Sequence, residues 1–104
     1  MYPKFIICCP PDDPECGTFV YGMVHQHKDL ISSRAYVRGG GWFQKNDFTK
    51  TMTLYGDSGD FGSPRFEYLR RVPAELKDYH FTYAEEWGDP EHDLSMKDIE
   101  WVEE

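Results

Sequence analysis

One histidine and one glycine-rich segment are the parts of this sequence whose residue types best fit a chemical role. His27 carries an imidazole, which titrates near neutral pH and can act as a general base or as a nucleophile. Gly56 to Gly62 reads Gly-Asp-Ser-Gly-Asp-Phe-Gly, and a glycine-rich loop can present backbone N–H groups to an anion. We expect any chemistry of this chain to lie between these two features.

A run of three glycines, Gly39 to Gly41, ends fifteen residues before Gly56 inside a segment that otherwise predicts a strand. Glycine in a strand costs conformational entropy and packs nothing, so the run indicates a bulge or the close approach of another group. Beyond the loop, Ser63 fits the N-cap of a helix and Pro64 its first residue. A strand, a glycine loop and a helix N-terminus would together favour a bound anion.

Several familiar catalytic and metal-binding motifs fail in this chain. The loop partly resembles the nucleophile segments of trypsin-like proteases and α/β hydrolases, but it lacks the second glycine of the first, and Asp60 replaces the last glycine of the second. No lysine follows either glycine cluster as in a Walker loop, and the spacing from Asp57 does not fit an EF-hand. His25 and His27 could face one metal, but no third ligand has a recognisable spacing, so we expect no metal site.

The composition indicates a small, acidic globular domain. The chain has 104 residues, of which 39% are hydrophobic and 16% aromatic, enough for one buried core. A formal net charge of −8 argues against nucleic acid and against anionic membranes as partners. Phe5 to Cys9 is too short an apolar run for a bilayer span or a secretory signal, so we expect a cytoplasmic protein.

The cysteines Cys8, Cys9 and Cys16 are expected to be free thiols. Adjacent residues of a strand point to opposite faces and rarely form a disulfide with each other. An odd number of cysteines without a signal peptide also favours free thiols. A bridge from Cys16 to one of the adjacent pair is the less favoured alternative.

The distribution of β-branched and aromatic residues predicts a single mixed α/β domain over residues 1–104. Strands are expected over residues 4–9, 18–24, 35–43, 51–55, 79–87 and 94–104. A helix is expected from Ser63, with a second turn over residues 74–77 after Pro73, and residues 25–33 fit either a short helix or an irregular turn. The expected fold is therefore α/β (α+β), a twisted mixed β-sheet of five to six strands with one or two helices. Residues 88–104 would form a possible C-terminal extension.

These features resemble the 14 kDa phosphohistidine phosphatase family, which includes the Janus proteins. The similarity runs without a gap from Gly39 to Gly62, and then continues with one small gap. The matching positions beyond the glycine run are Tyr55, Gly56, Ser58, Gly62, Asp78, Tyr79, Thr82, Tyr83 and Ala84. Upstream, Lys4 matches a family lysine at the start of the first strand, and His27-Lys28-Asp29-Leu30 is similar to the segment that carries the family's catalytic histidine.

The resemblance implies hydrolysis of a phosphoramidate or phosphoester without a metal or any other cofactor. His27 would be the catalytic base or nucleophile, and the substrate would be a phosphorylated protein or a small phospho-compound. The substrate-binding residues that it implies are Lys4, Gly56, Ser58, Gly59 and Asp60.

The chain also departs from the family at positions near the phosphate. Phe19 and Trp42 stand where the family has arginines, and Asp60 stands where it has a small residue, so an unpaired carboxylate would repel the substrate. These differences favour an alternative, a catalytically degenerate anion- or peptide-binding module on the same fold, with a cleft that Phe19 and Trp42 make more apolar. A third hypothesis is that the acidic segment from Glu85 to Glu104 meets a basic partner.

Overall fold

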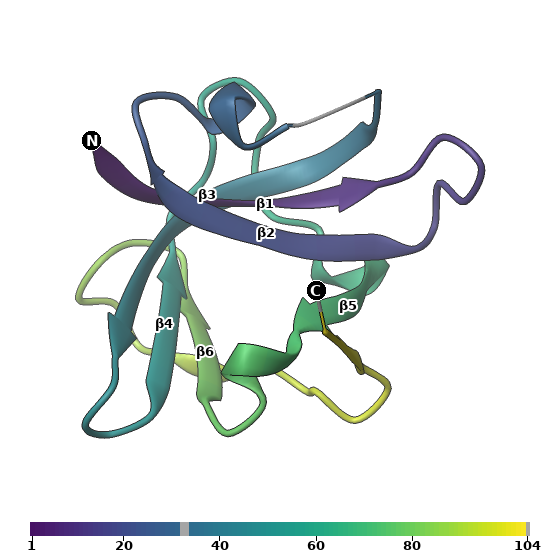
Figure 1. The fold of residues 1–104 in the computed structure, drawn as a ribbon. Helices are drawn as coiled ribbons and strands as arrows, with labels where there is room; N and C mark the ends of the chain where they lie inside the picture. The colour runs from purple at the N-terminus through teal and green to yellow at the C-terminus, as the bar shows by residue number, and fades with distance from the viewer. Residues whose placement is uncertain (32–33, 104) are drawn as a thin grey trace.

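The computed structural model describes residues 1–31 and 34–103, and it shows one β-sheet that curls into a half-barrel (Figure 1). The eight strands of this sheet are β1 (Tyr2–Cys9), β2 (Gly17–Val24), β3 (Tyr36–Asn46), β4 (Thr51–Tyr55), β5 (Leu69–Pro73), β6 (His80–Ala84), β7 (His92–Asp93) and β8 (Glu100–Val102). Three short 3₁₀ segments accompany them, namely η1 (His27–Leu30), η2 (Phe66–Tyr68) and η3 (Ala74–Leu76).

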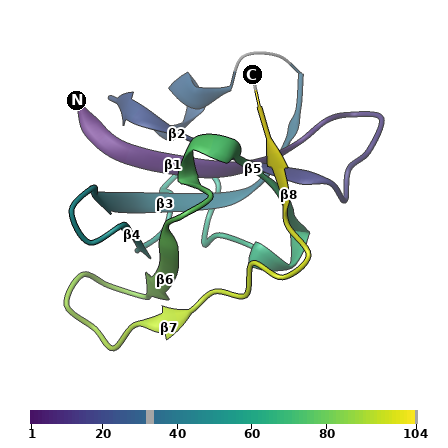
Figure 2. The same cartoon turned by 60° about the horizontal axis from the view of Figure 1, so that its bottom comes forward.

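The sheet is mixed, as the sequence predicts. Its strand order is β7-β6-β4-β3-β1-β2-β5-β8, so the two shortest strands lie at the edges (Figure 2). The central strands β2, β1, β3 and β4 pair antiparallel, whereas the β2–β5, β4–β6 and β5–β8 pairs are parallel. Short edge strands leave few unpaired backbone groups and so protect the sheet from pairing with another chain.

The expected sheet of five to six strands with one or two helices is wrong. The helix predicted from Ser63 is absent, and its place is taken by the single turn η2 followed by β5. The N–H of Arg65 donates to the carbonyl of Arg38 at 2.9 Å, which ties the segment to β3 rather than to its own next turn. Pro73 would end a helix after less than three turns, and such a short helix is marginal; the residues after η2 pair with β2 and β8 instead.

The core lies inside the curl of the sheet and contains side chains from most strands. Its buried members are Phe5, Ile7, Phe19, Phe43, Met52, Leu54, Leu69, Val72, Leu76 and Phe81. Phe5 and Phe19 stack with ring centroids 5.2 Å apart, and Phe81 packs edge-on against Phe19 at 5.8 Å. Phe19 is therefore a core residue whose ring is fully buried.

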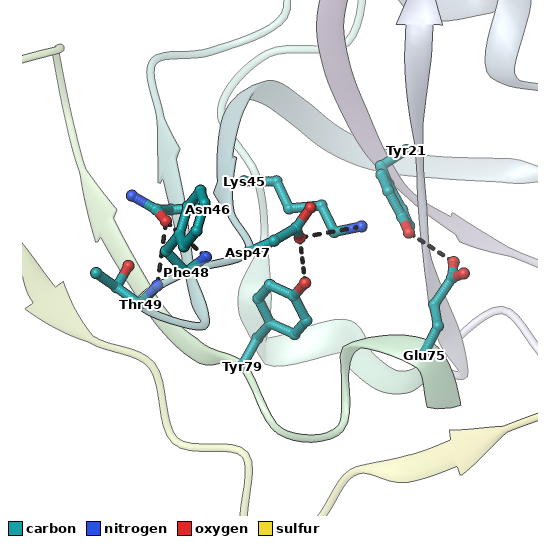
Figure 3. Close-up of polar contacts among 8 residues, drawn as sticks. All are labelled: Tyr21, Lys45, Asn46, Asp47, Phe48, Thr49, Glu75 and Tyr79. Carbon is teal, nitrogen blue, oxygen red and sulfur yellow. Dashed lines mark hydrogen bonds and ion pairs between the residues drawn. The ribbon is translucent and has the colours of Figure 1, made fainter.

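Two tyrosines tie the later segments to strands far away in the sequence (Figure 3). Tyr21 of β2 donates its hydroxyl to Glu75 of η3, and Tyr79, just before β6, donates to Asp47 in the β3–β4 turn. The hydrogen bond from Tyr79 is the main cause of a lowered pKa of Asp47, and Lys45, whose Nζ lies 3.6 Å from Asp47 Oδ1, acts in the same direction.

Most strand expectations are confirmed, and residues 88–103 join the sheet. The runs predicted over residues 4–9, 18–24, 35–43, 51–55 and 79–87 correspond to β1, β2, β3, β4 and β6. The segment expected as an extension supplies β7 and β8, of which β7 was not predicted. Residues 32 and 33 of the segment expected as a short helix or turn, and residue 104, lie outside the described residues. Among the described residues, no helix has the length and apolar character needed to cross a membrane.

Candidate functional site

His27 lies in the turn η1, which follows β2 and covers the outer face of the sheet. The Asp29 carboxylate accepts a hydrogen bond from the N–H of Gln26 at 3.0 Å, and the Gln26 carbonyl accepts one from the N–H of Asp29 at 3.0 Å. These two bonds close the turn and direct the His27 side chain onto the sheet, where it is only 3% exposed. The segment left open as a helix or an irregular turn is thus, over residues 27–30, a single 3₁₀ turn.

The three glycines of β3 allow this close approach, as their sequence position predicts. A Cβ on Gly40 would lie 3.3 Å from His27 Cδ2 and 2.3 Å from the Phe5 carbonyl oxygen. A Cβ on Gly39, whose φ is +82°, would lie 1.9 Å from the Ser63 carbonyl oxygen. The glycine run therefore admits the histidine and the end of the glycine loop to one stretch of strand.

The hydrogen bond of His27 determines which of its ring nitrogens is free. His27 Nε2 lies 2.8 Å from the carbonyl oxygen of Gly41, and since a carbonyl only accepts, Nε2 carries the hydrogen. No described residue hydrogen-bonds Nδ1, and no buried side-chain nitrogen or oxygen in the described chain lacks a partner, so Nδ1 keeps a small contact with solvent although the ring is only 3% exposed. In the neutral ring, Nδ1 then presents its lone pair outward.

The surroundings of His27 keep its imidazole neutral. Burial lowers the pKa of His27 below its ordinary value of 6.5, and the nearby charge of Lys4 adds to this effect. The hydrogen bond to Gly41 and the charges of Asp60 and Asp57 act in the opposite direction but are outweighed. The ring is therefore a neutral base at pH 7, and an imidazolium formed during a reaction has two carboxylates near it.

Lys4 lies close to His27, but its ammonium group already has partners. Lys4 Nζ donates to the carbonyl of His25 at 2.8 Å, and it lies 5.0 Å from the centre of the Trp42 ring and 5.5 Å from that of Tyr2. The Trp42 ring in turn meets His27 edge-on at 6.4 Å. Trp42 thus contributes an aromatic wall next to the histidine.

Much of the hydrogen-bonding capacity of the Gly56–Gly62 loop is used within the loop itself. Ser58 and Gly62 exchange two backbone hydrogen bonds of 3.1 and 2.8 Å. The buried Ser58 Oγ accepts from the N–H groups of Asp60 at 3.3 Å and Phe61 at 3.2 Å. Among the described residues, only the N–H groups of Asp57 and Gly59 in this part of the loop are left without an acceptor.

The loop and the histidine meet at the glycine run. The carbonyl of Gly62 accepts a hydrogen bond from the N–H of Gly40 at 3.2 Å, and Gly40 lies under the His27 ring. The structure thus places the end of the loop, at Gly62, on the same stretch of β3 that lies under His27. It does not place a helix N-terminus behind the loop, because no helix begins at Ser63.

The far side of the loop opens onto an acidic hollow of about 680 Å³. Its lining residues are Gly56, Asp57, Ser63, Pro64, Tyr83, Glu85, Glu86 and Asp89. Tyr83 donates its hydroxyl to the Gly56 carbonyl at 2.9 Å, which fixes the start of the loop to β6. The sequence gives no signal for this hydrogen bond between Tyr83 and Gly56, although Tyr83 is one of the positions of the resemblance. These carboxylates oppose anion binding.

Metal and thiol chemistry have little support among the described residues. No group of three or more histidine, cysteine or acidic side chains there is arranged to hold a metal ion. Cys8, Cys9 and Cys16 are all free thiols, in agreement with their spacing. Burial raises the pKa of Cys9, which makes its thiol less reactive.

A scan against protein-family models, a search of curated proteins and a search of solved structures each found no match.

Proposed function

We propose that this chain is a divergent phosphohistidine-phosphatase-like protein that hydrolyses a phosphoramidate or a phosphoester without a metal ion. His27 is the catalytic base or nucleophile in this proposal. The observation that carries it is the Nε2 hydrogen bond to Gly41, because this bond leaves Nδ1 of a neutral ring as the nitrogen whose lone pair has no partner among the described residues. The resemblance from Gly39 to Gly62 supplies the substrate class.

As a base, Nδ1 takes a proton from a water molecule whose oxygen attacks the phosphorus. The P–N or P–O bond then breaks, and the leaving atom takes the proton back from the imidazolium. As a nucleophile, Nδ1 attacks the phosphorus itself, the P–N or P–O bond breaks, and the leaving atom takes a proton from water. In a second step water attacks the phosphorus of the phosphoryl-imidazole, the N–P bond breaks, and phosphate and the neutral ring are released. In both cases the N–H groups of Asp57 and Gly59 are the loop donors that remain for the phosphoryl oxygens.

Hydrolysis of a phosphohistidine-containing peptide, measured as released phosphate in the presence of a chelator, tests this proposal. We expect His27→Ala to reduce the rate at least about a hundredfold, the usual contribution of a general base. His25→Ala is the matched control, because His25 is an exposed histidine two residues away and only its backbone carbonyl contacts Lys4. Equal rates for the wild type and His27→Ala would contradict the proposal.

The second candidate is a catalytically degenerate module that binds without turnover. It is favoured by the loop itself, since Ser58 Oγ and the Asp60 and Phe61 amides are engaged with one another. The exposed carboxylates of Asp57 and Asp60 add repulsion to any phosphate nearby. Binding of a non-hydrolysable phosphoramidate analogue by a wild type that shows no turnover would establish this candidate instead.

A further inference from the structure

A cleft lined by two aromatic side chains that contact each other lies on the outer face of the sheet, where β4 and β6 end. Tyr55 ends β4, and Trp87 follows β6; their ring centroids are 5.0 Å apart and their planes meet at 56°. The cleft has a volume of about 250 Å³ and is lined by Thr53, Tyr55, Ala84, Trp87, Gly88, Asp89 and Glu91. Because Leu54 is buried in the core, its strand neighbour Tyr55 points to the opposite face.

The backbone holds Trp87 in this exposed position. The N–H of Asp89 donates to the carbonyl of Glu86 at 3.1 Å, which closes a four-residue turn. Gly88 has a φ of +93°, the value that the third position of a type II turn requires. Trp87 at the second position is 61% exposed, and a tryptophan fixed in solvent beside a second aromatic ring indicates a binding surface.

The charges around this aromatic cleft define its occupant. Asp89 and Glu91 form one wall of the cleft, and Asp89 also lines the larger acidic hollow together with Asp57, Glu85 and Glu86. Across residues 1–31 and 34–103, none of these five carboxylates forms a salt bridge with a lysine, arginine or histidine. The cleft and the hollow therefore form one continuous surface on which aromatic rings adjoin uncompensated negative charge.

We propose that this surface binds a basic peptide segment, with one arginine or lysine side chain stacked on the exposed face of Trp87, beside Tyr55. A cation over an aromatic ring is attracted to its face, and arginine in particular also stacks flat on it. Neighbouring cationic residues of the peptide then face Glu85, Glu86 and Asp57 in the hollow. This binding goes beyond the proposed hydrolysis and does not depend on His27.

The probe is a blocked octapeptide of alternating glycine and arginine, labelled for fluorescence anisotropy and titrated with the full chain in low salt. The matched probe replaces each arginine by citrulline, which keeps the shape of the side chain and removes its charge. We expect the Kd for the citrulline peptide to be at least about tenfold higher, and high salt to weaken binding of the arginine peptide.

Trp87→Ala tests whether the aromatic cleft itself is the site, and we expect it to raise the Kd for the arginine peptide about tenfold. Phe48→Ala is the control, because Phe48 is a fully exposed aromatic residue in the β3–β4 turn, outside the cleft. Circular dichroism and urea unfolding of each variant establish that it is folded. His27→Ala should bind the peptide as the wild type does, so failure of the proposed hydrolysis and failure of this binding are distinguishable.

Three results would overturn the inference. Equal affinity for the arginine and citrulline peptides would mean that charge does not select the ligand. A wild-type Kd in Trp87→Ala would mean that the negative charge of the whole chain attracts the peptide without a site. Tighter binding of a neutral proline-rich peptide would mean that the cleft recognises an apolar extended segment instead.

Discussion

The hydrogen bond from His27 Nε2 to Gly41 acts at the scale of a single residue, because it selects one tautomer and leaves Nδ1 free. Burial on the sheet lowers the pKa of the ring, and this same burial makes protonation unfavourable for the folded state. The site chemistry and the pH dependence of stability therefore have one cause. A variant that keeps the hydrogen bond but cannot titrate separates the two effects.

His27→Gln should make the free energy of unfolding less dependent on pH below neutral. The unfolded histidine titrates near 6.5, whereas the folded one has a lowered pKa, so the unfolded state binds more protons in the window below 6.5. Wild-type stability is therefore fully present above this window and falls as the pH drops through it. Glutamine can donate to Gly41 without titrating, and urea unfolding at several pH values measures the difference.

His25→Gln is the control for this measurement, since it removes an exposed histidine of the same segment. A change in pH dependence that His27→Gln shows and His25→Gln does not is specific to the buried ring. If His27→Gln and the wild type show parallel curves between pH 5 and pH 7, the burial of the His27 ring in solution is contradicted.

At the scale of elements, the glycine run of β3 is the feature on which the site depends. The carbonyl oxygen of Ser63 occupies the space where a Cβ on Gly39 would lie. The carbonyl oxygen of Phe5 and the ring of His27 lie close to the Cβ position of Gly40. The same residues explain why β3 can pair with β1 and β4 and still receive η1 and the loop on its outer face. Gly39 and Gly40 therefore belong to the paired strand β3 and also allow the site to pack against it.

Gly39→Ala should destabilise the protein by about 2–4 kcal/mol, because it adds a Cβ 1.9 Å from the Ser63 carbonyl oxygen at a φ of +82°. Gly59→Ala is the matched control, since no atom lies within 4 Å of the Cβ position there and φ is not positive. It should change the free energy of unfolding by less than about 0.5 kcal/mol. Equal urea midpoints for the two variants would contradict the close packing of the loop on β3.

At the scale of the whole molecule, the chain closes its sheet with a segment from its C-terminal end. β8 pairs in parallel with β5, and the half-buried Trp101 packs against the core cluster. Arg71 and Glu100 add an ion pair of 3.1 Å, but both side chains are exposed, so its contribution is small. Burial of Trp101 is therefore the main stabilising contribution of β8.

A chain that ends at Ile99 should lose about 1–3 kcal/mol of unfolding free energy, the amount expected when a large apolar side chain no longer packs. Glu100→Gln keeps the strand and removes only the exposed ion pair, so it should lose less than about 1 kcal/mol. Urea midpoints compare the two. A shortened chain as stable as the wild type would mean that β8 does not pack against β5 in solution.

The sequence by itself determined the features that depend on local chemistry. Runs of β-branched and aromatic residues predicted β1 to β4 and β6, because such side chains fit the pleated surface of a strand. The glycine run predicted a close approach to the backbone, and His27 and the glycine loop were expected together. The spacing of the cysteines also predicted free thiols.

Tertiary structure alone decided the conformation of segments whose local sequence fits more than one structure. Ser63 and Pro64 fit a helix start, yet the segment that follows became a strand because β2 offered it backbone partners. An aromatic residue on a strand, such as Phe19, more often fills a core than lines a cleft, and the stacking on Phe5 places it inside the curl. The acidic surroundings of the Trp87 cleft likewise arise from segments that meet only after folding, since contacts across the sheet are not encoded in local pattern.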